Sequence, residues 1–127
     1  MTPSARVQAA IEILDEVIAS ARQDGPPADA VVTRYFKVRR YAGSKDRRAV
    51  RELVFRAIRR SGEIPDSGRS AMLGLADEDI DVAALFDGSL HGPIAGIPDE
   101  KGACASLVPS WIQSLLSSHV TADEWPA

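Results

Sequence analysis

Residues 34–60 read RYFKVRRYAGSKDRRAVRELVFRAIRR, and this stretch says the most about how the chain folds. It holds 11 of the 15 Lys and Arg residues but only 2 of the 18 acidic residues, a net charge of +9. The other 100 residues hold 4 basic and 16 acidic residues, a net charge of −12. Charge is therefore strongly segregated along a chain whose formal net charge is only −3.

The second half of this stretch predicts an amphipathic helix over residues 45–60. Ser44 is the expected N-cap, and Asp46 in the first turn suits the positive end of the helix dipole. At about 100° per residue, apolar residues fall on one half of the helix and most basic residues on the other. The apolar half holds Ala49, Val50, Leu53, Val54, Ala57 and Ile58, and the cationic half holds Lys45, Arg48, Arg51, Arg56 and Arg59. We expect Phe55 at the edge of the core, with an exposed stacking platform as the alternative.

Two further helices are expected before this one. Thr2-Pro3 supply an N-cap hydroxyl and a proline at the first helical position, and apolar residues recur from Val7 to Ala21 at helical spacing. Gly25-Pro26-Pro27 would end this helix, and its acidic side is expected to be solvated. Residues 28–41 are expected to form the next helix, which Ala42-Gly43 would break.

Shorter helices are expected after a loop at residues 65–68. The first two cover residues 70–76 and roughly 80–86, the second with Asp77 or Asp79 as its N-cap. Beyond a Gly- and Pro-rich segment, helices are expected over residues 103–108 and 109–120, and another is expected to begin at Thr121. No segment alternates as a half-buried strand does. The sequence thus predicts an all-α bundle of five to seven helices, forming one domain over residues 1–127.

Composition limits the possible locations of the protein. The single cysteine, Cys104, cannot form an internal disulfide, which fits a reducing compartment. The first 25 residues lack the basic start and apolar run of a signal peptide, and no apolar run approaches the roughly 18 residues of a membrane span. We expect a cytoplasmic protein.

The sequence contains no recognisable catalytic motif. His91 and His119 do not stand in a metal-ligand spacing, and Cys104 is expected to be a small core residue. The acidic segment at 77–88 lacks the glycine and the closing glutamate of a calcium-binding EF-hand loop. We therefore expect no catalytic, metal-binding or cofactor-binding residue in this chain. An enzyme acting on its own would need a pocket that gathers His91, Cys104 and His119.

The basic stretch predicts contact with a polyanion. Unopposed like charges destabilise a helix, so such a strip is expected where phosphates supply the counter-charge. The candidate RNA-binding residues are Arg39, Arg40, Lys45, Arg47, Arg48, Arg51, Arg56, Arg59 and Arg60. Tyr35, Phe36 and Tyr41 are candidates for stacking on bases. Two alternatives stay open: a merely solvated helix face, and a structural role for Arg47 or Arg59 in pinning loops through buried hydrogen bonds.

A family resemblance points to a particular RNA. The motif GSKDRRAVRELVFRAIRR (43–60), preceded by ARVQAAIEILDEVI (5–18), resembles the NusB-like N-terminal domain of the RsmB (Sun/Fmu) family. These enzymes use S-adenosylmethionine to make 5-methylcytosine in ribosomal RNA. The matching residues are Asp46, Arg47, Glu52, Leu53, Val54, Phe55, Ile58, Arg59 and Arg60, and LFDG (85–88) and PSWI (109–112) also resemble family segments.

The resemblance implies a NusB-like, RNA-binding accessory domain made of two packed three-helix bundles. Family enzymes continue into a Rossmann-like methyltransferase domain with a glycine-rich cofactor loop and two catalytic cysteines, and this chain has neither. We therefore expect it to be part of a longer rRNA cytosine-5 methyltransferase, with S-adenosylmethionine bound and rRNA processing carried out outside this fragment. The alternative is a protein-interaction module whose basic strip docks an acidic partner, as in transcription antitermination or on a ribosome, since NusB itself pairs with a protein.

Overall fold

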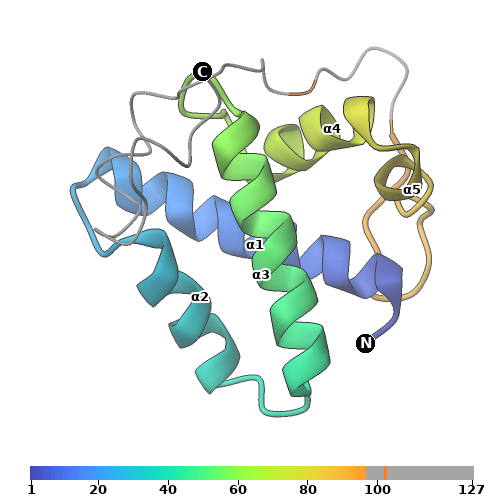
Figure 1. The fold of residues 1–127 in the computed structure, drawn as a ribbon, viewed down its shortest axis with the longest axis horizontal. Coiled ribbons are helices and arrows are strands. Elements are labelled where there is room, and N and C mark those ends of the chain that lie inside the picture. The colour runs from blue at the N-terminus through green and yellow to red at the C-terminus, as the bar shows by residue number, and fades with distance from the viewer. Residues whose placement is uncertain (97–101, 103–127) are drawn as a thin grey trace.

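Five α-helices make up the described part of the fold (Figure 1). They are α1 (Pro3–Arg22), α2 (Ala28–Lys37), α3 (Ser44–Arg60), α4 (Gly68–Glu78) and α5 (Ile80–Ala83). The computed structural model describes residues 1–96 and 102; the helices expected over 103–108, 109–120 and from Thr121, together with Cys104 and His119, lie outside these residues. The predicted all-α helical bundle is confirmed. No helix in the described part is both long and apolar enough to cross a membrane.

Helix α1 is the central element, because it packs against α2, α3 and α4. Figure 1 shows α3 crossing α1, with α2 to one side and α4 and α5 to the other. The start of α1 is the predicted one, since Thr2 Oγ1 accepts a hydrogen bond from the Ala5 N–H at 3.1 Å. The helix ends at Arg22, and Asp24 then takes a left-handed backbone conformation with a φ of 50°.

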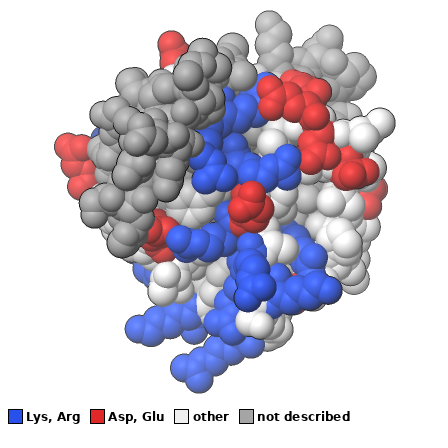
Figure 2. Space-filling model, in the orientation of Figure 1, with Lys and Arg blue, Asp and Glu red and all other residues white. Residues whose placement is uncertain are grey.

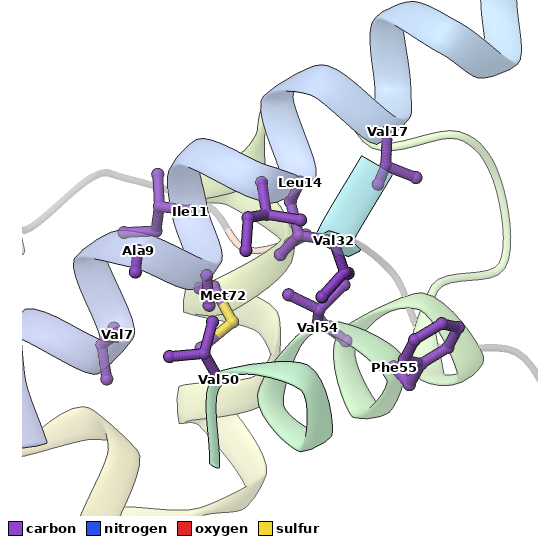
Figure 3. Packing of buried hydrophobic residues seen from close by; sticks show 14 of the residues in the cluster. Val7, Ala9, Ile11, Leu14, Val17, Val32, Val50, Val54, Phe55 and Met72 are labelled. Carbon is purple, nitrogen blue, oxygen red and sulfur yellow. The ribbon is translucent and has the colours of Figure 1, made fainter. Parts of the chain in front are cut away.

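The core lies where α1, α3 and α4 meet (Figure 3). The predicted stripe of α1 is buried from Val7 to Ile18, and so is most of the apolar face of α3. Ala9 and Ile13, which lie off the predicted stripe, are also buried. Because three helices surround α1, its buried surface is wider than the stripe of a helix that packs on one side only.

Helices α1 and α4 approach each other closely at Gly68. A Cβ atom on this glycine would lie 2.1 Å from the Ile11 carbonyl oxygen, so the contact requires a residue without a side chain. The Gly68 N–H donates to Asp15 Oδ1 at 2.7 Å. Asp15 therefore holds the start of α4, although its side of α1 was expected to be only solvated.

The segment between α2 and α3 differs from the prediction at both ends. Helix α2 ends at Lys37 instead of residue 41. Arg39 donates its backbone N–H to the Phe36 carbonyl at 3.1 Å and its guanidinium to the Tyr35 carbonyl at 3.0 Å, which satisfies carbonyls of the last turn. The predicted N-cap at Ser44 is also wrong, because Gly43 is the N-cap and Ser44 is the first residue of α3.

The helices expected over residues 70–76 and roughly 80–86 are confirmed with different bounds. Helix α4 begins two residues earlier than predicted, because Ser67 caps it by accepting from the Ser70 N–H at 3.0 Å. Helix α5 ends at Ala83 instead of residue 86. Of the two predicted caps for α5, Asp79 is the correct one, since its Oδ1 accepts from the Asp81 N–H at 3.0 Å.

Candidate nucleic-acid interface

The basic residues of 34–60 lie on α3, on the end of α2 and on the loop between them. Figure 2 shows Lys and Arg side chains gathered along α3 and at the end of the molecule where α2 ends and α3 begins. Asp and Glu side chains gather mainly to one side, over α4 and α5. The charge segregation seen along the sequence therefore persists on this face of the folded protein.

One group of these cations has no acidic partner among the residues that the structure describes. Six exposed side chains make no ion pair with any residue in the described ranges, and we call them the α2–α3 cluster: Arg34, Lys37, Arg40, Lys45, Arg47 and Arg48. Arg39 lies beside the cluster, with its guanidinium carbon 3.7 Å from the centre of the Tyr35 ring. Four of the nine candidate RNA-binding residues belong to the cluster: Arg40, Lys45, Arg47 and Arg48.

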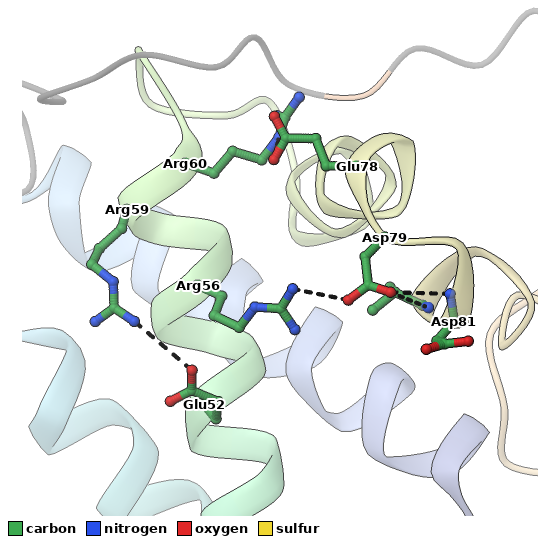
Figure 4. Close-up of polar contacts among 8 residues, drawn as sticks. Glu52, Arg56, Arg59, Arg60, Glu78, Asp79 and Asp81 are labelled. Carbon is green, nitrogen blue, oxygen red and sulfur yellow. Dashed lines mark hydrogen bonds and ion pairs between the residues drawn. The ribbon is translucent and has the colours of Figure 1, made fainter. Parts of the chain in front are cut away.

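A second group of four arginines, on the following turns of α3, pairs with acids of the fold. Figure 4 shows three of them. Arg56 contacts Asp79 at 2.9 Å. Arg60 contacts Glu78 at 3.1 Å, and Arg59 lies 4.0 Å from Glu52. Further toward the start of α3, Arg51 forms an ion pair with Asp29 of α2. We call Arg51, Arg56, Arg59 and Arg60 the paired group.

Two members of the paired group connect α3 to α4 and α5. The Arg60 side chain is only 13% exposed beside Glu78, near the end of α4. Arg56 binds Asp79, the residue that also caps α5, and this hydrogen bond holds the pKa of Asp79 below its ordinary value. Arg56 and Arg60 thus join α3 to the helices that follow it, whereas the role considered for Arg47 or Arg59, pinning loops through buried hydrogen bonds, is not seen at either residue in the described part. Arg47 is exposed, and Arg59 pairs within α3 itself.

Asp46 is the one acid in the first turn of α3, and it faces α1. Its Oδ1 accepts from Arg6 Nε at 2.9 Å, and its Oδ2 contacts the amine of Met1 at 3.3 Å. The hydrogen bond from Arg6 is the main cause that lowers the pKa of Asp46. Adjacent side chains on a helix do not face each other, and no ion pair among the described residues joins Asp46 to Lys45 or Arg47.

The aromatic residues of the stretch divide into buried and exposed ones. Phe55 is 8% exposed with Arg51 over its ring, which confirms the edge-of-core prediction. Tyr35 and Phe36 are also buried and pack edge to face, with ring centres 5.2 Å apart. Tyr41 is 75% exposed in the loop between α2 and α3. Of the three candidate stacking residues, Tyr41 alone presents a largely exposed ring.

A cleft between α2 and α3 adjoins the cluster. Its volume is about 510 Å³. Its apolar wall comes from α2 and its cations from both helices; the lining residues are Val32, Thr33, Phe36, Lys37, Arg47, Arg48 and Arg51. We call it the α2–α3 cleft. It is the place where members of the cluster and an apolar surface meet.

A larger groove of about 1010 Å³ runs along the first half of α1. In it, the Tyr35 hydroxyl donates to Glu12 Oε1 at 2.6 Å. Burial raises the pKa of Tyr35, and the bond to Glu12 raises it further. His91 also lines this groove, while Cys104 and His119 lie outside the described residues. Within the described part, no three His, Cys, Asp or Glu side chains are grouped to hold a metal ion.

Three features distinguish this face of the molecule: the six cations of the α2–α3 cluster, the adjacent cleft and the exposed ring of Tyr41. The chain matches no protein-family model, no curated protein and no solved structure.

Proposed function

We propose that this chain is an RNA-binding domain that holds structured RNA through the α2–α3 cluster. The observation that carries the proposal is the contrast between the two groups of cations. The paired group has acidic partners inside the fold, whereas the six cluster residues have none among the described residues. Cations grouped in this way repel one another, and bound phosphates relieve the repulsion.

The spacing of the cations along α3 supports a polyanion as the ligand. Lys45 and Arg48 stand three residues apart on α3, so they are neighbours on its surface. Each such like-charge pair destabilises a helix by about 0.2–0.5 kcal/mol. An RNA backbone carries regularly spaced phosphates and can contact several of these side chains at once. Arg39 and Arg40 extend the same surface into the loop that carries Tyr41.

The proposed mode of binding is recognition of backbone and shape. Phosphate contacts position a protein on RNA but carry no sequence information by themselves. Lys45, Arg47 and Arg48 supply such contacts, and Arg39 and Arg40 add more. Tyr41 offers a ring on which one unstacked base can pack. Arg51, Arg56, Arg59 and Arg60 are secondary in this proposal, since phosphates would have to compete with their acidic partners.

On the motif resemblance of residues 43–60, we further propose that the domain is NusB-like and serves an rRNA cytosine-5 methyltransferase. All three cluster members on α3, Lys45, Arg47 and Arg48, fall within that motif. The role of this chain would be to hold ribosomal RNA, while S-adenosylmethionine binding and methyl transfer belong to a separate domain. No residue of this chain is assigned to the cofactor.

The test is titration of the protein with a fluorescent RNA hairpin at 50 and 200 mM salt. Binding should weaken steeply as salt rises, because each phosphate contact releases counterions. The double variant Arg47→Gln/Arg48→Gln should lower the slope of log affinity against log salt by about two, roughly one per lost contact. The matched control Arg22→Gln/Arg59→Gln removes the same charge outside the cluster and should leave the slope within about half a unit.

Two outcomes would overturn the proposal. The first is hairpin binding that does not change between the two salt concentrations, or equal effects of the two double variants. The second is binding of poly-glutamate without binding of RNA. That second result would favour the protein-interaction module that docks an acidic partner.

A further inference from the structure

The loop between α2 and α3 presents two large, exposed side chains next to the α2–α3 cluster. Figure 1 shows this loop at one edge of the fold, where it joins the end of α2 to the start of α3. Tyr41 is 75% exposed, and Arg40 is exposed as well. Because Tyr41 keeps most of its surface outside the core, its ring is available for contact, unlike the buried rings of Tyr35 and Phe36.

These two residues occupy the centre of a tight turn. The Ala42 N–H donates to the Arg39 carbonyl at 3.2 Å, which closes a turn of four residues, 39–42. Arg40 and Tyr41 are its two central residues, so their Cα atoms lie about 3.8 Å apart. A ligand that contacts one of the two side chains therefore also lies within reach of the other.

Both ends of the turn are held by the fold. The Arg39 guanidinium donates to the Tyr35 carbonyl at 3.0 Å, and its carbon lies 3.7 Å from the centre of the Tyr35 ring. The Arg39 N–H donates to the Phe36 carbonyl at 3.1 Å. At the other end, Ala42 is 1% exposed and belongs to the hydrophobic core. The two central residues are thus presented by an anchored turn, which lowers the cost of ordering the backbone when a ligand binds.

An unpaired nucleotide has the chemistry that matches these two side chains. Its base has a flat face that stacks on an exposed aromatic ring, and its phosphate pairs with an arginine. In a regular RNA duplex the bases are stacked inside the helix, whereas bases of loops and bulges can be splayed out onto a protein. The cations of the α2–α3 cluster are then left to contact phosphates of the neighbouring duplex.

We infer that the turn at residues 39–42 receives one unpaired nucleotide of the bound RNA. Its base stacks on Tyr41, and its phosphate contacts Arg40. This inference rests on the proposed function and gives its substrate class: structured RNA that carries a bulged or looped-out nucleotide beside a duplex. Stacking uses the flat face that every base has, so the four bases should be accepted with similar affinity.

The experiment compares three RNA probes: a perfect duplex, the same duplex with one added bulged nucleotide, and that bulge without its base. The wild-type protein should bind the bulged duplex at least about fivefold more tightly than the perfect one, the lower end of the gain from stacking one base. The bulge without a base should lose this preference. It keeps the phosphate and the interruption of the duplex but offers no face to stack.

Variants of residue 41 test the ring itself. Tyr41→Ala should reduce the preference for the bulge to less than about twofold and leave binding of the perfect duplex unchanged. Tyr41→Phe keeps the ring and should keep the preference. Val38→Ala is the matched control, since Val38 is 76% exposed in the same loop but lies outside the turn. It removes an equally exposed apolar side chain and should also keep the preference.

The other outcomes separate this inference from the proposed function. Equal, salt-dependent binding of the perfect and the bulged duplex by the wild-type protein would overturn the inference and leave RNA binding in place. A preference that persists for the bulge without a base, or in Tyr41→Ala shown to be folded by circular dichroism, would also overturn it. Failure of the wild-type protein to bind any of the probes would overturn both proposals.

Discussion

The first turns of α3 and its later turns carry similar charge but use it differently. Lys45, Arg47 and Arg48, in the first turns, are exposed and make no ion pair with a described acid. Arg56 and Arg60, toward the end, contact Asp79 and Glu78. The same helix therefore exposes a cationic surface in its first turns, whereas Arg56 and Arg60 in its last turns bind acids at the end of the next helix.

This comparison shows why a cationic strip on a helical wheel is not by itself a binding surface. The wheel reports which side of a helix a residue faces, but not which elements approach that side. Helices α4 and α5 place acids beside Arg56 and Arg60, whereas no acid is among the described residues that line the cleft beside Arg47 and Arg48. The neighbours thus decide which arginines remain available to a ligand.

Charge reversal at the two ends of α3 should give the largest difference in stability. Arg60→Glu places a second acid beside Glu78 at a side chain that is 13% exposed. We expect a loss of about 2 kcal/mol in the free energy of unfolding, between the values for surface and buried pairs. Arg47→Glu should change it by no more than about 0.5 kcal/mol. Urea unfolding followed by circular dichroism measures both, and equal losses would contradict the comparison.

Acid should weaken the later turns of α3 through Asp79. The hydrogen bond from Arg56 lowers the folded-state pKa of Asp79 below the ordinary 3.8. The stabilisation is therefore present above about pH 4 and is lost as pH falls through the lower, folded-state pKa. Asp79→Asn keeps an N-cap side chain but removes the charge. Urea midpoints measured from pH 6 to pH 2.5 should fall less in this variant than in the wild-type protein.

Equal acid sensitivity of the two proteins would show that Asp79 is not among the groups responsible. Asp46 provides an internal comparison, because the hydrogen bond from Arg6 lowers its pKa in the same direction. The acid sensitivity that remains in Asp79→Asn should include the loss of the contact between Asp46 and Arg6.

A smaller effect on RNA binding is expected when Arg51 loses its acidic partner, which makes it similar to the residues of the α2–α3 cluster. Asp29→Asn removes the carboxylate that pairs with Arg51, at the edge of the α2–α3 cleft. We expect RNA affinity to rise about twofold to threefold. The slope of log affinity against log salt should become steeper by up to about one unit, the value for one added phosphate contact. Glu52→Gln is the matched control, since Glu52 pairs with Arg59 away from the cleft. A comparable rise in the control would attribute the gain to net charge alone.

The positions of the helices could be predicted because their signals are local. Thr2-Pro3 start α1 as expected, and the apolar spacing of residues 49–58 places the buried face of α3 correctly. The errors lie at helix ends. Helix α2 stops at Lys37 because Arg39 binds back to the carbonyls of Tyr35 and Phe36, a bond that no propensity scale contains.

The candidate site was only partly predictable, for a related reason. Nothing in the spacing of the arginines distinguishes Arg48 from Arg56. The difference arises from Asp79, which is 23 residues beyond Arg56 and meets it only when α4, the helix whose C-cap is Asp79, packs against α3. The contacts of Asp15 with Gly68 and of Glu12 with Tyr35 were missed likewise, because they join separate helices.

The sequence by itself determined an all-α chain with a cationic helix, because periodicity and net charge are properties of neighbouring residues. The tertiary structure decided which cations pair with acids of the fold and which do not, within the described residues. The physical reason is range: a helix forms through bonds between residues about four apart, whereas an ion pair such as that of Arg60 with Glu78 joins residues of two helices. Packing alone brings these residues within reach.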